Sequence, residues 1–272
     1  MVRRVSPAGK NYARIHLAMV QSFGLSDPGL VRTTNQDRIL VDNSLGLYLL
    51  ADGVGGQSHG ETAAELAIAS GQYYVRASRD SFDVSWPFGY DVNRSLNENR
   101  LMTAIQLANR QLCKLKATSP EHASANSTIV GVLVDGSRAT MGNVGDSRVY
   151  MLRRGELKQL SIDDTWVGQL VRGGAITEAQ ARNHSMRHVV TQAVGAETIE
   201  VHTCEERLEN GDLILLTTDG IHGVLEHAVV CSILANCRSL EDGAKRLIES
   251  ALDQGGPDNA SCVLVRYGED RN

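Results

Sequence analysis

Five aspartates stand where a short apolar run begins or ends, most of them beside a glycine. They are Asp37, Asp52, Asp146, Asp219 and Asp258. Taken singly, an aspartate in such a place is most often a turn former that caps its own backbone. Taken together, the five predict a carboxylate cluster, because the ends of strands in one sheet converge.

Such a cluster would repel itself and therefore needs compensating cations. Hard oxygen ligands without cysteine or histidine select magnesium or manganese rather than zinc. Two such ions suit the hydrolysis of phosphate esters, because they lower the pKa of a shared water and neutralise charge on the phosphoryl oxygens. Arg32, which precedes Asp37 by five residues, is a candidate for bidentate phosphate contact. The competing interpretation of Arg32 is an exposed loop arginine.

Short apolar runs bounded by Gly, Asn and Asp predict the buried strands that carry these residues. The strands are expected at 14–23, 37–42, 45–51, 127–135, 138–144, 147–153, 156–160, 199–206, 212–218 and 260–267. Asp135-Gly136 and Arg154-Gly155 are expected to form hairpin turns.

Apolar spacing of three and four predicts the longer helices. They are expected at 61–78, 98–116, 226–235 and 240–253. Thr62 and Glu65 have capping-box spacing at the start of the first helix, and Thr177 and Gln180 have it within a helical excursion over 163–198. This order of elements predicts two stacked sheets, or one large sheet, flanked by helices.

The composition is that of an ordinary globular protein, with 42% hydrophobic and 22% charged residues among 272. A net charge of −5 and the lack of Lys/Arg runs argue against a nucleic-acid partner. Five cysteines without a CxxC pair predict reduced thiols in the cytoplasm. No stretch approaches the roughly 20 apolar residues of a membrane span.

Five motifs in one order resemble the metal-dependent serine/threonine protein phosphatases (PPM, type 2C) in their compact bacterial form. The motifs are Ser26–Asp37, Ala51–Gly56, Asn143–Arg148, Thr218–Ile221 and Gly256–Ser261. The resemblance implies an α+β fold, a βα–αβ sandwich of two central antiparallel sheets flanked by helices, with a small helical flap at 163–190. We expect one domain over 14–268, a loose lead-in at 1–13 and a tail at 269–272.

The resemblance also implies which residues hold metal. By position, Asp52 would bridge two catalytic ions, manganese or magnesium, with Gly53 adding its carbonyl. Asp219 and Asp258 would complete the shell of the first ion. Asp146, with Asp219, would hold a weaker third ion.

The implied reaction is attack of a metal-bound hydroxide on a phosphoserine or phosphothreonine ester. Asp37 would hold metal-bound water near the nucleophile, and Arg32 would bind the phosphate. The implied partners are phosphorylated proteins, made by a serine/threonine kinase, and we expect a monomer.

Three positions depart from the family pattern. Gln36 stands where glutamate is common, and Gly223 stands where an acidic residue is frequent. Val54 stands where eukaryotic members carry a histidine proposed as general acid. We favour a metal-bound water as the proton donor in its place, with His59 as the alternative. Four histidines are considered as neighbours of the site, although surface or packing histidines are the commoner case: His59, His184, His188 and His222.

Two alternatives to an active phosphatase are a catalytically weak family member acting as a regulatory binding module, and a two-metal nuclease. The motif aspartates Asp52, Asp219 and Asp258 are all present, which argues against the first. The acidic charge balance argues against the second.

Overall fold

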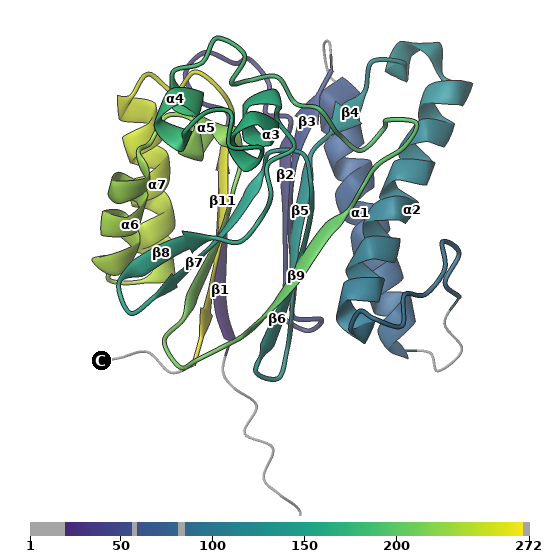
Figure 1. Cartoon of the computed structure of the whole chain (residues 1–272), viewed down its shortest axis with the longest axis horizontal. Helices are drawn as coiled ribbons and strands as arrows, with labels where there is room; N and C mark the ends of the chain where they lie inside the picture. Colours follow the sequence, from purple (N-terminus) through teal and green to yellow (C-terminus); the bar gives the residue numbers. More distant parts are fainter. Residues whose placement is uncertain (1–19, 56–58, 81–84, 269–272) are drawn as a thin grey trace, which may run out of the picture.

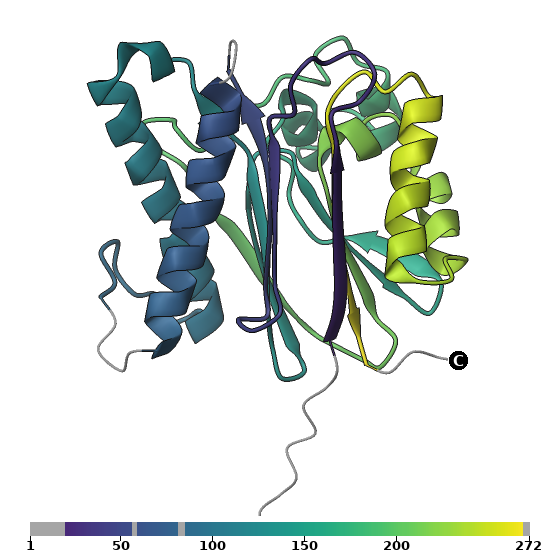
Figure 2. The same cartoon turned by 180° about the vertical axis from the view of Figure 1, so that it is seen from behind.

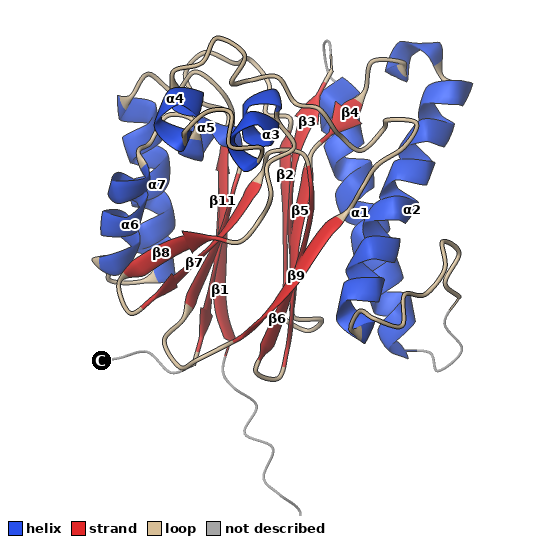
Figure 3. Cartoon of the chain, in the orientation of Figure 1, coloured by secondary structure: helices blue, strands red, loops and turns tan. Residues whose placement is uncertain are grey.

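Two antiparallel sheets lie face to face with helices on both outer sides (Figures 1 and 3). This computed structural model describes residues 20–55, 59–80 and 85–268. The expected α+β sandwich is confirmed, in the form of two stacked sheets. The lead-in at 1–13, residues 14–19 of the first expected strand and the tail at 269–272 lie outside the described residues.

The first sheet has the strand order β1-β11-β10-β7-β8. Its strands are β1 (Val20–Asp27), β7 (Arg148–Arg153), β8 (Glu156–Gln159), β10 (Leu213–Thr217) and β11 (Ala260–Tyr267). The expected end of the first strand at 23 is wrong, because β1 pairs with β11 over all eight residues, from Val20 opposite Tyr267 to Asp27 opposite Ala260.

The second sheet has the order β2-β3-β5-β6-β9, with the short β4 pairing with β3. Its strands are β2 (Asp37–Asp42), β3 (Leu47–Val54), β4 (Asn126–Ser127), β5 (Ile129–Asp135), β6 (Arg138–Val144) and β9 (His202–Arg207). Gly136 has a φ of 57°, and Arg154 and Gly155 have φ of 53° and 84°. These left-handed residues form the two expected hairpin turns.

Long helices cover the outer faces of both sheets (Figure 2). They are α1 (His59–Asp80) and α2 (Leu96–Thr118) on the second sheet, and α6 (His227–Ala235) and α7 (Leu240–Asp253) on the first. The expected capping box of Thr62 and Glu65 is wrong, because α1 already begins at His59. Ser95 and Glu98 form a capping box at the start of α2 instead.

Apolar side chains form three buried layers, one between the sheets and one under each helix pair. Tyr48, Leu50 and Ile214 belong to the layer between the sheets. The burial of these three layers supplies the rigid frame that carries the loops at the strand ends.

None of the helices in the described part of the chain is long and apolar enough to cross a membrane.

Short helices lie over the upper end of the sheets in Figure 1: α3 (Trp166–Arg172), α4 (Glu178–Arg182) and α5 (Asp219–His222). A further 3₁₀ turn, η1 (Pro120–His122), follows α2. The expected capping box of Thr177 and Gln180 is confirmed at α4. Helices α3 and α4 lie within the expected helical excursion. We call residues 163–190 the flap.

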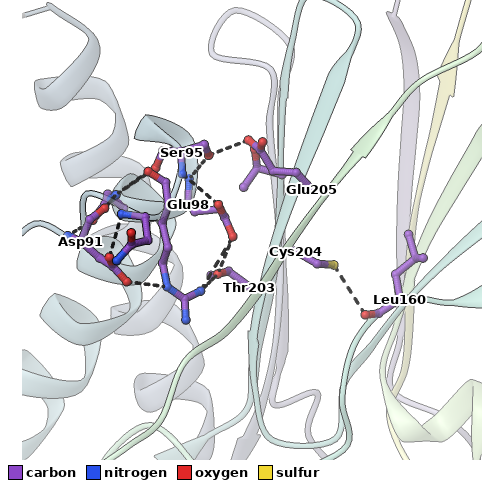
Figure 4. A network of polar contacts seen from close by, with 11 residues as sticks. Asp91, Ser95, Glu98, Leu160, Thr203, Cys204 and Glu205 are labelled. Carbon is purple, nitrogen blue, oxygen red and sulfur yellow. Dashed lines mark hydrogen bonds and ion pairs between the residues drawn. The ribbon is translucent and has the colours of Figure 1, made fainter.

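A polar network holds β9 in place (Figure 4). Thr203 in β9 donates to the Glu98 carboxylate of α2 at 3.0 Å, and the Cys204 thiol donates to the Leu160 carbonyl at 3.7 Å. Strand β9 is therefore fixed both to the helix on its outer side and to the segment that follows β8.

Candidate metal and phosphate site

The β2–β3 hairpin places Asp37 directly opposite Asp52 as Cα partners. Opposed residues in an antiparallel pair point to the same face, so the two carboxylates face the same region. Burial, the charge of Asp37 and the charges of three further aspartates raise the pKa of Asp52 well above its usual value. Those three are Asp219, Asp146 and Asp258. The charges of the other four predicted aspartates thus all act on Asp52.

Asp37 lies deepest in the cluster, with only 3% of its surface exposed. Burial raises its pKa to about 7, although hydrogen bonds from Ser261 and Thr218 act in the opposite direction. The Thr218 hydroxyl donates to Asp37 Oδ2 at 2.9 Å. A carboxylate held in this way is oriented by the fold before any ligand arrives.

Asp219 opens α5 directly after β10. Its Oδ1 is buried and has no hydrogen-bond partner among the described residues. The pKa of Asp219 is raised, first by burial and then by the charge of Asp258. A buried, unpartnered carboxylate oxygen is costly, and a cation is the ligand that would satisfy it.

The glycines beside two aspartates are required by close backbone packing. A Cβ at Gly53 would lie 2.0 Å from the Gly60 carbonyl oxygen, and one at Gly220 would lie 1.9 Å from the Asn259 carbonyl oxygen. The Asp-Gly pairs therefore let β3 approach α1 and let α5 approach the start of β11.

Asp146 follows Gly145 in the turn between β6 and β7. Burial raises its pKa to about 7, and the charges of Asp219 and Asp163 act in the same direction. Asp146 thus lies near Asp219 but on a strand connection separate from the hairpin that carries Asp37 and Asp52.

Arg32 reaches this cluster from an exposed loop. Its Nη2 donates to Asp258 Oδ2 at 2.7 Å, while 56% of its side chain stays exposed. The hydrogen bond to Asp258 raises the pKa of Arg32, and the charges of Asp219 and Asp52 do the same. Arg32 therefore presents a guanidinium at the rim of the carboxylates.

The donor set suits a hard divalent cation. Across the described residues, no group of three or more His, Cys, Asp or Glu side chains is arranged so that it could hold a metal ion. Magnesium-type sites use only one or two carboxylates for each ion and keep several waters. Five mutually repelling carboxylates, with the orphaned Asp219 Oδ1, fit such shared and hydrated ions.

Asn259 supports the site, although the sequence patterns assign it no role of its own. Asn259 accepts a hydrogen bond from the Gln36 amide at 2.8 Å and donates to the Pro28 and Thr34 carbonyls at 2.8 and 2.9 Å. It thereby fixes the loop that carries Arg32. The motif Gly256–Ser261 contains this asparagine, but its contacts reach residues more than 220 positions away.

The four candidate histidines occupy different surroundings. His59 packs edge-on against His122, and His184 accepts a hydrogen bond from the Met186 amide. Burial and the Arg148 charge lower the pKa of His222 well below its usual value, so His222 stays neutral. His188, on the exposed flap, acts to lower the pKa of Asp219.

The structure shows the surroundings of the three residues that depart from the family pattern. A Cβ at Gly223 would lie 2.5 Å from the Asp219 carbonyl oxygen, so a larger residue would require the turn to shift. Val54 is exposed at the end of β3. The Gln36 side-chain amide donates to the Gly55 carbonyl at 3.4 Å.

The model of the family "Protein phosphatase 2C" matches residues 31–263. Serine/threonine protein phosphatase PstP of Mycobacterium tuberculosis is 33% identical over 240 residues, which are 88% of this chain and 43% of PstP. The chain therefore spans less than half of that relative. The serine/threonine phosphatase stp of Listeria welshimeri is 30% identical over 245 residues, with 88% of this chain and 93% of the relative covered.

Solved structures show the same fold. A crystal structure of PstP/Ppp from Mycobacterium tuberculosis has a TM-score of 0.80 at 31% identity and covers 92% of this chain and 99% of its own. The PstP catalytic domain in complex with two manganese ions has a TM-score of 0.78 at 30% identity, with the same coverage. The chain belongs to the protein phosphatase 2C family.

Proposed function

We propose that this chain is a metal-dependent protein phosphatase that hydrolyses phosphoserine and phosphothreonine esters. The observation that carries the proposal is that the charges of four aspartates act on Asp52, with Arg32 at the rim and with Asp219 Oδ1 left without a hydrogen-bond partner among the described residues. The family membership and the two manganese ions in the PstP structure support it.

Asp52, Asp219 and Asp258, with the Gly53 carbonyl, are proposed to hold two manganese or magnesium ions. Asp146 and Asp219 are proposed to hold a weaker third ion. When bound, such ions lower the pKa of water and neutralise charge on phosphoryl oxygens.

The chain's own residues position the reactants. Arg32 is proposed to exchange its contact with Asp258 for the phosphate oxygens of the substrate, a match that its planar fork favours. Asp37, oriented through Oδ2 by Thr218, is proposed to hold metal-bound water near the nucleophile.

The proposed substrates are phosphorylated proteins, the products of serine/threonine kinases. The five cysteines are all free, which suits a reducing compartment such as the cytoplasm.

The test is hydrolysis of a phosphothreonine peptide by the purified chain, with manganese and with excess chelator. We expect turnover that requires manganese and is lost in Asp52→Asn. Asp212→Asn is a matched control, because Asp212 is buried and ion-paired with Arg153 outside the cluster. Metal binding without turnover would favour the binding-module alternative, and cleavage of DNA instead of the peptide would favour a nuclease.

A further inference from the structure

Asp164 makes a two-way connection with Gly145, the residue before Asp146. The Asp164 amide donates to the Gly145 carbonyl at 3.0 Å, and the Gly145 amide donates to Asp164 Oδ2 at 2.9 Å. Only 2% of Asp164 is exposed. Gly145 has a φ of 98°, which a side chain would strain. The turn that presents Asp146 is therefore held by Asp164.

The same aspartate joins the two ends of the flap. The Thr191 amide, at the flap's end, donates to the Asp164 carbonyl at 2.7 Å, and Gln192 Nε2 donates to Asp164 Oδ1 at 3.0 Å. Two residues further into the flap on each segment, the Trp166 amide donates to the Val189 carbonyl at 2.9 Å. A displacement of the flap base would therefore move the hydrogen-bond partners of Asp164.

Strand β9 supplies the third partner. His202 Nε2 lies 2.8 Å from Asp164 Oδ1, and a carboxylate only accepts, so Nε2 carries the donated hydrogen. The next two residues, Thr203 and Cys204, are bound to Glu98 and Leu160 (Figure 4). Asp164 is therefore tied to a strand that is itself fixed on both sides.

We propose that Asp164 is a positioning residue that couples the flap to Asp146. Its Oδ2 sets the Gly145–Asp146 turn, while its Oδ1 is held by Gln192 at the flap's end and by His202. This inference rests on the proposed function in one respect, namely that Asp146 binds a divalent ion.

The coupling has a reciprocal consequence. If the flap's position sets the affinity of Asp146 for its ion, then binding of that ion must stabilise the same flap position by the same free energy. A substrate that contacts the flap would thereby adjust the weakest ion of the site without touching it.

The test compares Asp164→Asn with Asp212→Asn. Both aspartates are 2% exposed, and each accepts a backbone amide and a side-chain donor through its carboxylate. Only Asp164 lies at the flap base. The substitution keeps the size of the side chain but removes its charge and part of its accepting capacity.

The first readout is amide hydrogen exchange in the metal-free protein, which needs no catalysis. We expect exchange at Gly145 to be roughly tenfold faster in Asp164→Asn, since its amide loses a charge-assisted acceptor. Exchange at Thr191, which donates to the Asp164 backbone carbonyl, should also be faster because the neighbouring Gln192 contact with Oδ1 is weakened. Both should be unchanged in Asp212→Asn. Equal exchange in wild type and Asp164→Asn would overturn the proposal.

The second readout is the manganese concentration for half-maximal phosphopeptide hydrolysis. We expect it to rise roughly tenfold in Asp164→Asn, with kcat recovered at saturating manganese. In an Asp146→Asn background the same change should have no further effect. A shift no larger than in Asp212→Asn, or full additivity with Asp146→Asn, would contradict the coupling.

Two features keep the test decisive. If Asp164→Asn does not fold, His202→Ala takes its place, because it removes a partner of Oδ1 and leaves the Gly145 contact with Oδ2 intact. We expect smaller increases in amide exchange and in the half-maximal manganese concentration. If neither increases, the proposal is overturned. If the wild type hydrolyses no phosphopeptide, the proposed function fails, whereas the exchange readout still decides whether Asp164 holds the turn.

Discussion

Removal of the Arg32 side chain is the most informative single substitution at the rim of the site. Among the described residues Arg32 donates a hydrogen bond to Asp258 at 2.7 Å, and its side chain is 56% exposed, so its loss leaves the buried frame intact. A charge-assisted contact contributes about 1.5–3 kcal/mol. Arg32→Ala should therefore lower kcat/KM roughly tenfold to a hundredfold, with the lower figure favoured because solvent screens a half-exposed charge.

The assay is steady-state hydrolysis of a phosphothreonine peptide at saturating manganese, together with inhibition by inorganic phosphate. Arg32→Ala should weaken phosphate inhibition by a similar factor, and Arg32→Lys should recover only part of kcat/KM because lysine lacks the bidentate fork. Arg76→Ala is the matched control, since Arg76 is 55% exposed and donates to the Asp42 carboxylate at 2.9 Å. Wild-type kinetics and phosphate inhibition in Arg32→Ala would refute the phosphate contact and leave Arg32 as an exposed loop residue.

Three further predictions concern stability and proton transfer. Burial and neighbouring carboxylates raise the pKa of Asp37 to about 7, so its ionised form destabilises the metal-free protein at pH 8. Asp37→Asn should therefore raise the melting temperature of the chelator-treated protein at pH 8 while abolishing turnover. An unchanged melting temperature would argue against repulsion within the carboxylate cluster. Although burial opposes it, hydrogen bonds lower the pKa of Asp42 to about 2, so its stabilisation is present at neutral pH and is lost as pH falls through about 2. Urea unfolding should accordingly show Asp42→Asn less stable than wild type by about 1–2 kcal/mol at pH 7, and a difference that did not narrow below pH 4 would contradict this. His59→Ala and His222→Gln should each leave the ratio of phosphothreonine-peptide kcat to aryl-phosphate kcat within about twofold of wild type, whereas loss of a general acid would change it by about 10²–10⁴-fold.

Local patterns predicted most of the elements. The hairpin turns Asp135-Gly136 and Arg154-Gly155 carry their own conformational signal, because a left-handed backbone favours glycine. The apolar pattern predicts an end of the first strand at 23 because Ser22 and Gly24 interrupt it, and only the pairing with β11 shows that the strand continues to Asp27. Helix α1 begins before its capping-box spacing because that spacing also occurs inside helices.

The candidate site was predictable where a residue's type carries the chemistry. The aspartates stand out because each one ends or begins an apolar run, whereas the roles of Thr218 and Asn259 depend on contacts with residues 181 or more positions away. Asp163 and Asp164 are equivalent in the sequence. Only the fold separates them, since Asp163 pairs with Arg148 and Asp164 holds the Gly145 turn.

The most direct test of the central claim is a calorimetric titration of the metal-free chain with manganese, with phosphothreonine-peptide turnover measured on the same samples. The aspartate cluster predicts two tightly bound ions per chain, turnover that follows their occupancy, and loss of both in Asp52→Asn but not in Asp212→Asn. Unaltered manganese binding in Asp52→Asn, or full turnover in excess chelator, would contradict the account.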